Sequence, residues 1–263
     1  MRLWITFLLI LIATGCNSKT DKMTKIVFLH HSTGEAIWRG KTNKYIYRLT
    51  GQGDVQKYFA SYNRKNRTNY EISAINFPKS SPYGWNNYPY DYYNIWVKNA
   101  GQKSYLEEPT LEMLTAEYDV IIFKHCFPVS RIISDIGSPD INSDVKSIGN
   151  YKLQYDALKQ KMHEFPEKKF IVWSPAANTK NKSQEDEALR TREFYSWMIN
   201  EWDEIGDNIF IWDFYNYETE GGLYLSDKNA HSPDNSHPGK EFSAKVAPLF
   251  GQFIIDVIES KID

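Results

Sequence analysis

Five short apolar segments recur along the chain. They are rich in β-branched and aromatic residues, and they cover residues 25–30, 70–77, 118–124, 169–174 and 208–214. Most of them lack the alternation of a strand with one wet face, as in the run Val120-Ile121-Ile122-Phe123. Continuous apolar strands of this kind are typical of a parallel sheet that is covered on both faces. We therefore predict five buried strands.

Segments with helical spacing of apolar residues separate the predicted strands. The candidates are residues 55–62, 104–116, 150–165, 184–202 and 240–259. The last one places Phe242, Val246 and Phe253 on one face, and Pro248 is expected to bend it. Strands and helices thus alternate five times. This alternation predicts an α/β fold, a three-layer doubly wound sandwich with a mostly parallel five-stranded sheet.

Ligands of such folds bind at the carboxyl ends of the strands. The loops that begin at His31, Phe77, His125, Pro175 and Tyr215 are therefore the places to look for chemistry. No internal repeat and no linker inside residues 25–263 divides the chain, so this range is predicted to be one domain.

The amino terminus carries an apolar run of about 13 residues behind Arg2, too short to span a bilayer as a helix. The run ends in Ala13-Thr14-Gly15-Cys16, which resembles a lipobox, although Ala13 stands where the pattern prefers leucine. The resemblance implies a signal peptide over residues 1–15, a lipid on Cys16 and a polar tether over residues 16–24. The expected location is the cell envelope, on the periplasmic or the outer-membrane and cell-surface side. A buried N-terminal helix or a plain secretory signal is the alternative.

Composition narrows the choice of function. Hydrophobic residues make up 41% and charged residues 24% of the chain, as in globular proteins. The net charge of −2 gives no long-range field that would attract polyanions, which argues against a nucleic-acid partner. If Cys16 carries a lipid, Cys126 is the remaining cysteine, and the mature chain has no intramolecular disulfide.

A serine follows the first predicted strand directly, in His30-His31-Ser32-Thr33-Gly34. Ser32 therefore occupies the position of a nucleophile at a strand's carboxyl end. The small Thr33 and Gly34 allow backbone N–H groups to converge on the same point, as an oxyanion hole requires. Alternatively, Ser32 caps the next helix.

An acid and a base lie three residues apart just before the last predicted helix, at Asp234 and His237. A serine hydroxyl needs an imidazole to take its proton, and the imidazole needs a carboxylate to fix its tautomer. The pair can supply both. Alternatively, the two residues only shape a turn and a helix start.

This arrangement resembles the SGNH (GDSL-like) hydrolase superfamily over residues 25–263. The resemblance implies that Ser32 is the nucleophile, Asp234 the acid and His237 the base. It also implies an oxyanion donor from a glycine in the second block, for which Gly84 is the candidate. The usual Gly-Asp-Ser and Gly-x-Asn-Asp sequences are absent. Lys124-His125-Cys126 stands in place of the latter, so His125 is the candidate second donor.

The sequence also contains residues for three other kinds of site. The six histidines show no tight ligand spacing, so no metal and no cofactor are expected. Cys126 beside His125 is a thiol nucleophile or, more simply, a buried free cysteine. The aromatic run over residues 82–96 suits stacking on sugar rings, or it packs against its own domain.

The sequence therefore predicts an extracytoplasmic serine esterase that removes acyl groups from carbohydrate. Its partners are a small-molecule or glycan ester and, through Cys16, a membrane. The alternative is a catalytically weak or inactive lipoprotein of the same fold that binds glycans.

Overall fold

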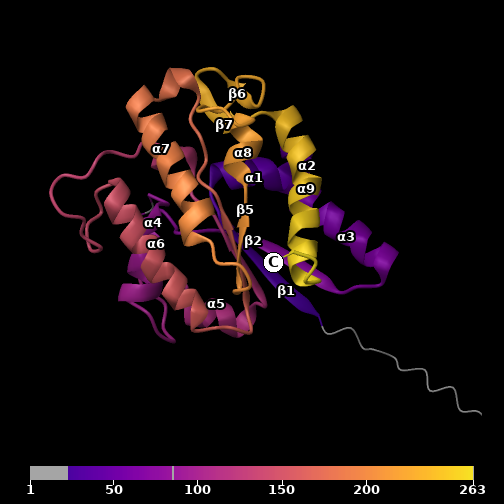
Figure 1. The fold of residues 1–263 in the computed structure, drawn as a ribbon. Helices are drawn as coiled ribbons and strands as arrows, with labels where there is room; N and C mark the ends of the chain where they lie inside the picture. The colour runs from indigo at the N-terminus through magenta and orange to yellow at the C-terminus, as the bar shows by residue number, and fades with distance from the viewer. Residues whose placement is uncertain (1–22, 85, 263) are drawn as a thin grey trace, which may run out of the picture.

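Five parallel strands form the centre of the molecule in the order β2-β1-β3-β4-β5 (Figure 1). The computed structural model describes residues 23–84 and 86–262. Within them the strands are β1 (Thr24–His30), β2 (Tyr70–Asn76), β3 (Val120–Phe123), β4 (Lys169–Trp173) and β5 (Ile209–Trp212). All four pairings are parallel, so the predicted sheet is confirmed and no strand in it runs antiparallel.

The continuous apolar runs are explained by the two covered faces of the sheet. In β3, Val120 and Ile122 lie in one hydrophobic cluster, whereas Ile121 and Phe123 lie in the other. All four side chains are buried, because successive residues of a strand point to opposite faces and both faces carry helices. A central strand of this fold has no wet face and so shows no alternation.

Helices cover the sheet from two sides (Figure 1). On one face lie α1 (Ser32–Arg39), α3 (Asp54–Asn66) and α9 (Lys240–Ile258), with α2 (Lys44–Thr50) outside them. The other face carries α4 (Pro89–Tyr93), the π-helical η1 (Asn94–Lys98), α5 (Leu111–Glu117), α6 (Ile148–His163), α7 (Glu185–Trp197) and the π-helical η4 (Met198–Trp202). Together the helices and the sheet make the three predicted layers.

The loops at the carboxyl ends of the strands hold short elements that the apolar pattern did not predict. These are the 3₁₀ turns η2 (Phe127–Ser130) and η3 (Lys180–Lys182), α8 (Phe214–Thr219), and the antiparallel hairpin of β6 (Ala230–Ser232) and β7 (Asn235–Pro238). None of them is long enough to show a periodicity. They nevertheless build the edge at which the candidate residues meet.

The helix predicted over residues 104–116 is wrong in its first half. Leu106 and Glu107 adopt left-handed backbone angles, and Tyr105 and Glu108 pair with each other in a tight bridge. The helix begins only after Pro109, with Thr110 as its cap. A residue before proline is pushed out of the helical region, so the helix does not extend back across this point. In contrast, α9 runs through Pro248 from Lys240 to Ile258 as one helix.

The strand order places a topological switch point between β1 and β3. The chain leaves β1 toward β2 on one side, whereas β3 leads on to β4 and β5 on the other. Connections that diverge in this way open a crevice at the carboxyl ends, where doubly wound folds bind ligands. Ser32 comes two residues after the end of β1, and residues 124–126 follow β3 directly, so reactive side chains lie on both sides of the switch point.

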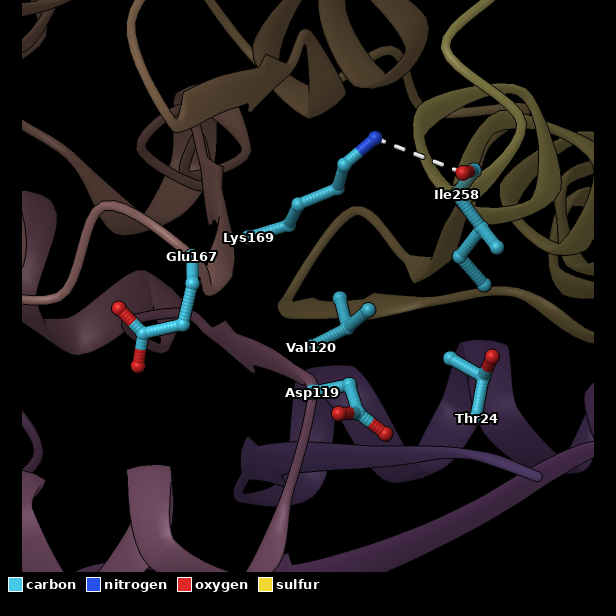
Figure 2. Close-up of a pocket in the computed structure, with 6 residues that line it drawn as sticks. All are labelled: Thr24, Asp119, Val120, Glu167, Lys169 and Ile258. Atoms are coloured by element: carbon cyan, nitrogen blue, oxygen red, sulfur yellow. Dashed lines mark hydrogen bonds between the residues drawn. The ribbon is translucent and has the colours of Figure 1, made fainter. Parts of the chain in front are cut away.

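A hollow at the opposite, amino edge of the sheet is shown in Figure 2. It is lined by Thr24, Asp119, Val120, Glu167, Lys169 and Ile258. Its lysine already has a structural role, because Lys169 Nζ donates to the Val257 and Ile258 carbonyls and to Ser260 Oγ at the end of α9. This lysine therefore caps a helix C-terminus, and the hollow lies away from the switch point.

Among the described residues, no helix combines the length and the apolar character needed to cross a bilayer. The predicted signal peptide and the lipidation site at Cys16 lie outside the described residues.

Candidate active site

Ser32 is the first residue of α1, and its side chain is exposed at the carboxyl edge of the sheet. His31, not Ser32, occupies the N-cap position, and no side-chain capping bond forms there. The interpretation of Ser32 as a helix cap is therefore wrong. Its hydroxyl instead faces the thiol of Cys126, with Oγ 3.9 Å from Sγ. The serine and the cysteine thus meet across the switch point.

A buried lysine lies behind the thiol. Lys124 Nζ is 3.3 Å from Cys126 Sγ, and the two residues are 1% and 3% exposed. Burial alone raises the pKa of the Cys126 thiol, but the Lys124 charge and the hydrogen bonds from the Thr33 N–H, Lys124 and Ser32 outweigh it and leave the pKa lowered. Burial also lowers the pKa of Lys124, and this is partly opposed by Cys126 and Glu218. The sulfur therefore lies in an electropositive site.

Strand alternation explains why Lys124 and Cys126 point the same way. Val120, Ile122, Lys124 and Cys126 have even numbers and continue the face that α1 and α9 cover. The ammonium group of Lys124 lies 5.9 Å from the ring centre of Trp173 on that face. Lys124 is not among the site residues predicted from the sequence. One signal in the sequence could have identified it. Lys124 continues the alternation of the buried residues Val120 and Ile122, so its charged side chain is expected on the same buried face.

His237 lies on β7 and has a defined tautomer. The Asn235 Oδ1 atom is 3.1 Å from the backbone N of His237 and 2.7 Å from its Nδ1. Because a backbone N–H can only donate, the Asn235 atom facing it is the oxygen. That oxygen accepts, so Nδ1 carries the proton. Nε2 of the neutral ring is then unprotonated and can act as a base.

Asp234, the acid predicted beside His237, does not bond to the imidazole, and the amide of Asn235 lies there in its place. Asp234 Oδ1 accepts a hydrogen bond from Asn181 Nδ2 at 3.3 Å, and Asn235 takes the position at the imidazole. The reason is the hairpin, in which Ser232 pairs with Asn235 and Asp234 lies in the turn between them. On a strand, residues two apart share a face, whereas the three-residue offset of Asp234 suits a helix.

Helix α1 and strand β7 pack against each other, which brings the two remote segments together. Burial lowers the pKa of His237, as do the charges of Lys124 and His231, whereas Glu35 of α1 raises it. The imidazole also lies edge-on to Phe127, the residue after Cys126, at 4.9 Å between ring centres. The hydrogen bond expected between Ser32 Oγ and His237 is not among those that the described residues form.

His125 does not point toward Ser32, so its predicted role as an oxyanion donor is wrong for this geometry. It lies on the sheet face opposite Lys124 and Cys126, edge-on to Tyr92 at 5.0 Å, with Nδ1 3.2 Å from the Asn87 carbonyl oxygen. Burial is the main reason that its pKa falls to about 3. His125 is therefore a neutral core residue.

The loop after β2 is anchored by Asn87 and not by Gly84. Asn87 is buried, accepts the Cys126 N–H at 2.9 Å and donates to the Phe77 carbonyl at 3.0 Å. Gly84 is exposed, with a φ of +85° and open space where a side chain would be, so its glycine serves a turn. Nothing in its surroundings marks it as an oxyanion donor.

Most aromatic residues of the run over residues 82–96 are core residues. Four of them are at least nine-tenths buried in the cluster beneath α4 and η1 or beside it: Tyr88, Tyr92, Tyr93 and Trp96. Tyr83 and Tyr90 are partly exposed and pack against that cluster. The packing alternative is therefore favoured for most of the described residues of this run, which leave Tyr83 and Tyr90 for sugar stacking, whereas Trp85 lies outside the described residues.

Thr33 and Gly34, expected to shape an oxyanion hole, pack α1 against the strands. Thr33 is fully buried, and its N–H donates to Cys126. A Cβ atom at Gly34 would lie 2.4 Å from the Cβ of His30 and 3.0 Å from the Cδ of Lys124. His30 itself is buried in the sheet, where the sequence interpretation placed it.

We expect Gly34→Ala to destabilise the protein by about 1–3 kcal/mol, because the added methyl group overpacks the contact of α1 with β1. Urea unfolding of the variant beside the wild type measures this. Glu35→Ala on the same helix, whose side chain is only half-buried, is the matched control. A Gly34→Ala protein as stable as the wild type would show that α1 can move away from the sheet without cost.

Over the described part of the chain, no three His, Cys, Asp or Glu side chains are grouped to hold a metal ion. In comparisons with known proteins, no family model and no curated protein matches this sequence.

The contacts described above define the candidate site. It consists of Ser32, His237 and Asn235 at the surface, with Cys126, Lys124 and Glu218 behind them.

Proposed function

We propose that the protein is a serine ester hydrolase of SGNH type that removes acyl groups from carbohydrate. The observation that supports this most directly is a histidine with a free Nε2, held by Asn235 on a hairpin that packs against the helix beginning with Ser32. The position of Ser32 at the switch point is the second support. No cofactor enters the proposed reaction.

In the proposed reaction, Ser32 Oγ attacks the ester carbonyl carbon, and the hydroxyl proton passes to His237 Nε2. The tetrahedral intermediate collapses, and His237 gives the proton to the departing alcohol. Water then hydrolyses the acyl-serine, with His237 again as base, which releases the acid and restores Ser32. Asn235 replaces the expected acid as the group that orients the ring. Oxyanion stabilisation comes from the positive end of α1 and the Lys124 charge.

Two features favour a second candidate, the weak or inactive glycan-binding form. Ser32 Oγ contacts Cys126 and not His237, and a neutral amide stands where a carboxylate would stabilise the imidazolium. Both features reduce the driving force for proton transfer. The burial of most loop aromatics does not separate the two candidates, because both of them bind carbohydrate.

For location, we propose a lipid on Cys16 and attachment to the cell envelope. Support comes from the sequence over residues 3–25, with its short apolar run, its Cys16 and the polar residues that follow. Mass spectrometry of the membrane fraction tests this, because a diacylglycerol on Cys16 adds a defined mass. A Cys16→Ala chain that remains in the membrane fraction would contradict it.

The test of the proposed activity is covalent trapping with a fluorophosphonate, a reagent that traps activated serines. We expect one adduct per chain, mapped by peptide mass spectrometry to Ser32, and its loss in the His237→Ala protein. Cys126→Ala is the matched control and is expected to retain the Ser32 adduct. No adduct on Ser32 in the folded wild type would remove the enzyme proposal, and an adduct on Cys126 would assign the nucleophile to the thiol.

The pH profile of ester hydrolysis tests the role of Asn235. Because the pKa of His237 is lowered in the folded protein, the wild type is expected to keep its activity below the usual pKa of histidine, 6.5. Asn235→Asp puts a negative charge at the 2.7 Å contact, so it raises this pKa and moves the acid limb up by about one pH unit or more. Asp234→Asn is the control and is expected to leave the acid limb in place. A shift of equal size in this variant would show that Asp234 sets the pKa of His237, as the sequence predicted.

A further inference from the structure

A groove with cationic walls lies between α1, α2, the β6–β7 hairpin and the start of α9. Its lining includes Arg39 from α1, Lys44 from α2, His231 from β6 and Lys240 from α9, and none of its lining residues is acidic. In Figure 1 these elements lie at one edge of the molecule, close to the label of β7. The Asp54 carboxylate lies behind Gly40 and Thr42 of this lining, where it accepts from the Lys41 N–H and the Thr42 hydroxyl, and the three charged side chains of Arg39, Lys44 and Lys240 outnumber it.

The N-terminus of α9 opens into the same groove. Its N-cap residue is Gly239, which has no side chain to accept bonds from the N–H groups of the first turn. Pro238, just before it, and Lys240, just after it, both line the groove. A helix of 19 residues carries a partial positive charge at this end, which attracts anions. The acid of the first turn, Glu241, is exposed and is not part of the lining.

A buried hydroxyl in the lining supplies an independent observation. Ser243 is 2% exposed and lines the groove, yet its Oγ atom has no hydrogen-bond partner. Buried hydroxyls are nearly always bonded, because leaving one unpaired costs free energy. An oxyanion at the mouth of α9 would accept from this hydroxyl and from the first-turn N–H groups together.

The groove also lies close to the candidate active site. Arg39 is seven residues after Ser32 on the same helix, which is about 10 Å along its axis. Pro238 follows His237 directly, and the charge of His231 already influences the pKa of that imidazole. A group held in the groove is therefore at the right distance to belong to the same substrate molecule as the ester.

We propose that this groove binds an oxyanion group, a carboxylate, sulfate or phosphate, carried by the substrate. The inference rests on the proposed function, which it refines: the ester would be on an acidic carbohydrate. The cationic walls hold the charge, Ser243 and the first turn of α9 bind its oxygens, and the ester extends along α1 to Ser32.

Binding is tested separately from catalysis, on Ser32→Ala protein with its full domain. Titration with sulfate, phosphate and glucuronate, followed by calorimetry or by NMR of the α9 amides, is expected to show saturable binding. The double variant Arg39→Gln and Lys44→Gln should weaken binding about fivefold or more, and Ser243→Ala should weaken it about fivefold.

Ser243→Ala removes an unpaired hydroxyl, so this variant is expected to fold. Lys65→Gln at the far end of α3 is the control for net charge. Absence of binding, or equal binding by all variants, would overturn the proposal.

Kinetics on the protein with Ser32 intact separate a substrate group from a free ion. With an acetylated uronic acid, the Arg39→Gln and Lys44→Gln protein should show a KM raised about fivefold with kcat unchanged. With the matched neutral acetylated sugar it should behave as the wild type. If anions bind but KM is unchanged for both esters, the groove takes free ions only, and its assignment to the substrate is wrong. Loss of esterase activity without loss of anion binding would refute the proposed function alone.

Discussion

Replacing Ser32 with alanine is expected to lower kcat/KM for ester hydrolysis by at least about a thousandfold. The reason is that removal of a serine nucleophile takes away the covalent route, and only binding and the local electrostatics are left. The substitution deletes one exposed oxygen at the start of α1, so the fold and its stability should not change. Initial rates with p-nitrophenyl acetate, with a thermal unfolding curve of each protein, measure both effects.

Cys126→Ala is the matched control for this result, because it removes the atom that Ser32 Oγ contacts. We expect it to keep most of the activity, since the thiol is 3% exposed and has no path to a bulky ester. Equal rates for the wild type and Ser32→Ala would reject the serine mechanism. A greater loss in Cys126→Ala than in Ser32→Ala would assign the reaction to the thiol that Lys124 stabilises.

The free energy of unfolding is expected to depend on pH through Glu218. This carboxyl group is fully buried on α8, where it accepts the Ala177 N–H at 2.8 Å, and burial raises its pKa to about 8. Because the folded pKa exceeds the unfolded one, the folded protein binds the proton more tightly. Its contribution is complete below about pH 4.5 and is lost as the pH rises through 8. The loss amounts to roughly 5 kcal/mol at most.

Glu218→Gln isolates this effect, because the amide oxygen can still accept from Ala177 while no proton is gained or lost. Urea unfolding at several pH values between 4.5 and 8.5 should show the wild type losing stability relative to the variant as the pH rises. Glu185→Gln, at an exposed position at the start of α7, is the control and should run parallel to the wild type. A constant difference between wild type and Glu218→Gln across this range would contradict the buried, protonated carboxyl.

The apolar pattern was sufficient to predict the sheet. The four successive buried residues from Val120 to Phe123 are typical of a strand covered on both faces, and β1, β4 and β5 follow the same logic. The edge strand β2 differs, because only Ile72 of its residues is buried. The start of α5 could not be found this way. There the outcome depends on the left-handed backbone of Leu106 and Glu107 and on Pro109, local effects that hydrophobicity does not record.

The candidate site was predicted only in part, because the hairpin of β6 and β7 changes which residue lies beside His237. The sequence placed His237 just before the last helix and near Ser32, and the structure puts it on β7, which packs against α1. It assigned the wrong partner, because a three-residue spacing was interpreted without knowing that the segment is a hairpin, where Asn235 shares the face of His237. Lys124 and Glu218 were missed, since a charged residue next to a buried strand is normally expected to be exposed.

If Cys16 carries the proposed lipid, the direction of β1 sets how far the candidate site lies from the membrane. The strand begins with Thr24 at the amino edge of the sheet and ends with His30 just before Ser32, about 20 Å away. Only seven residues separate Cys16 from Thr24, a reach of at most about 29 Å over eight residue steps. A lipid on that cysteine would hold the domain close to the bilayer by its base and leave Ser32 on the distal side. The esters within reach would then be those of polymers and solutes outside the membrane, whereas the acyl chains of the supporting lipids would be out of range.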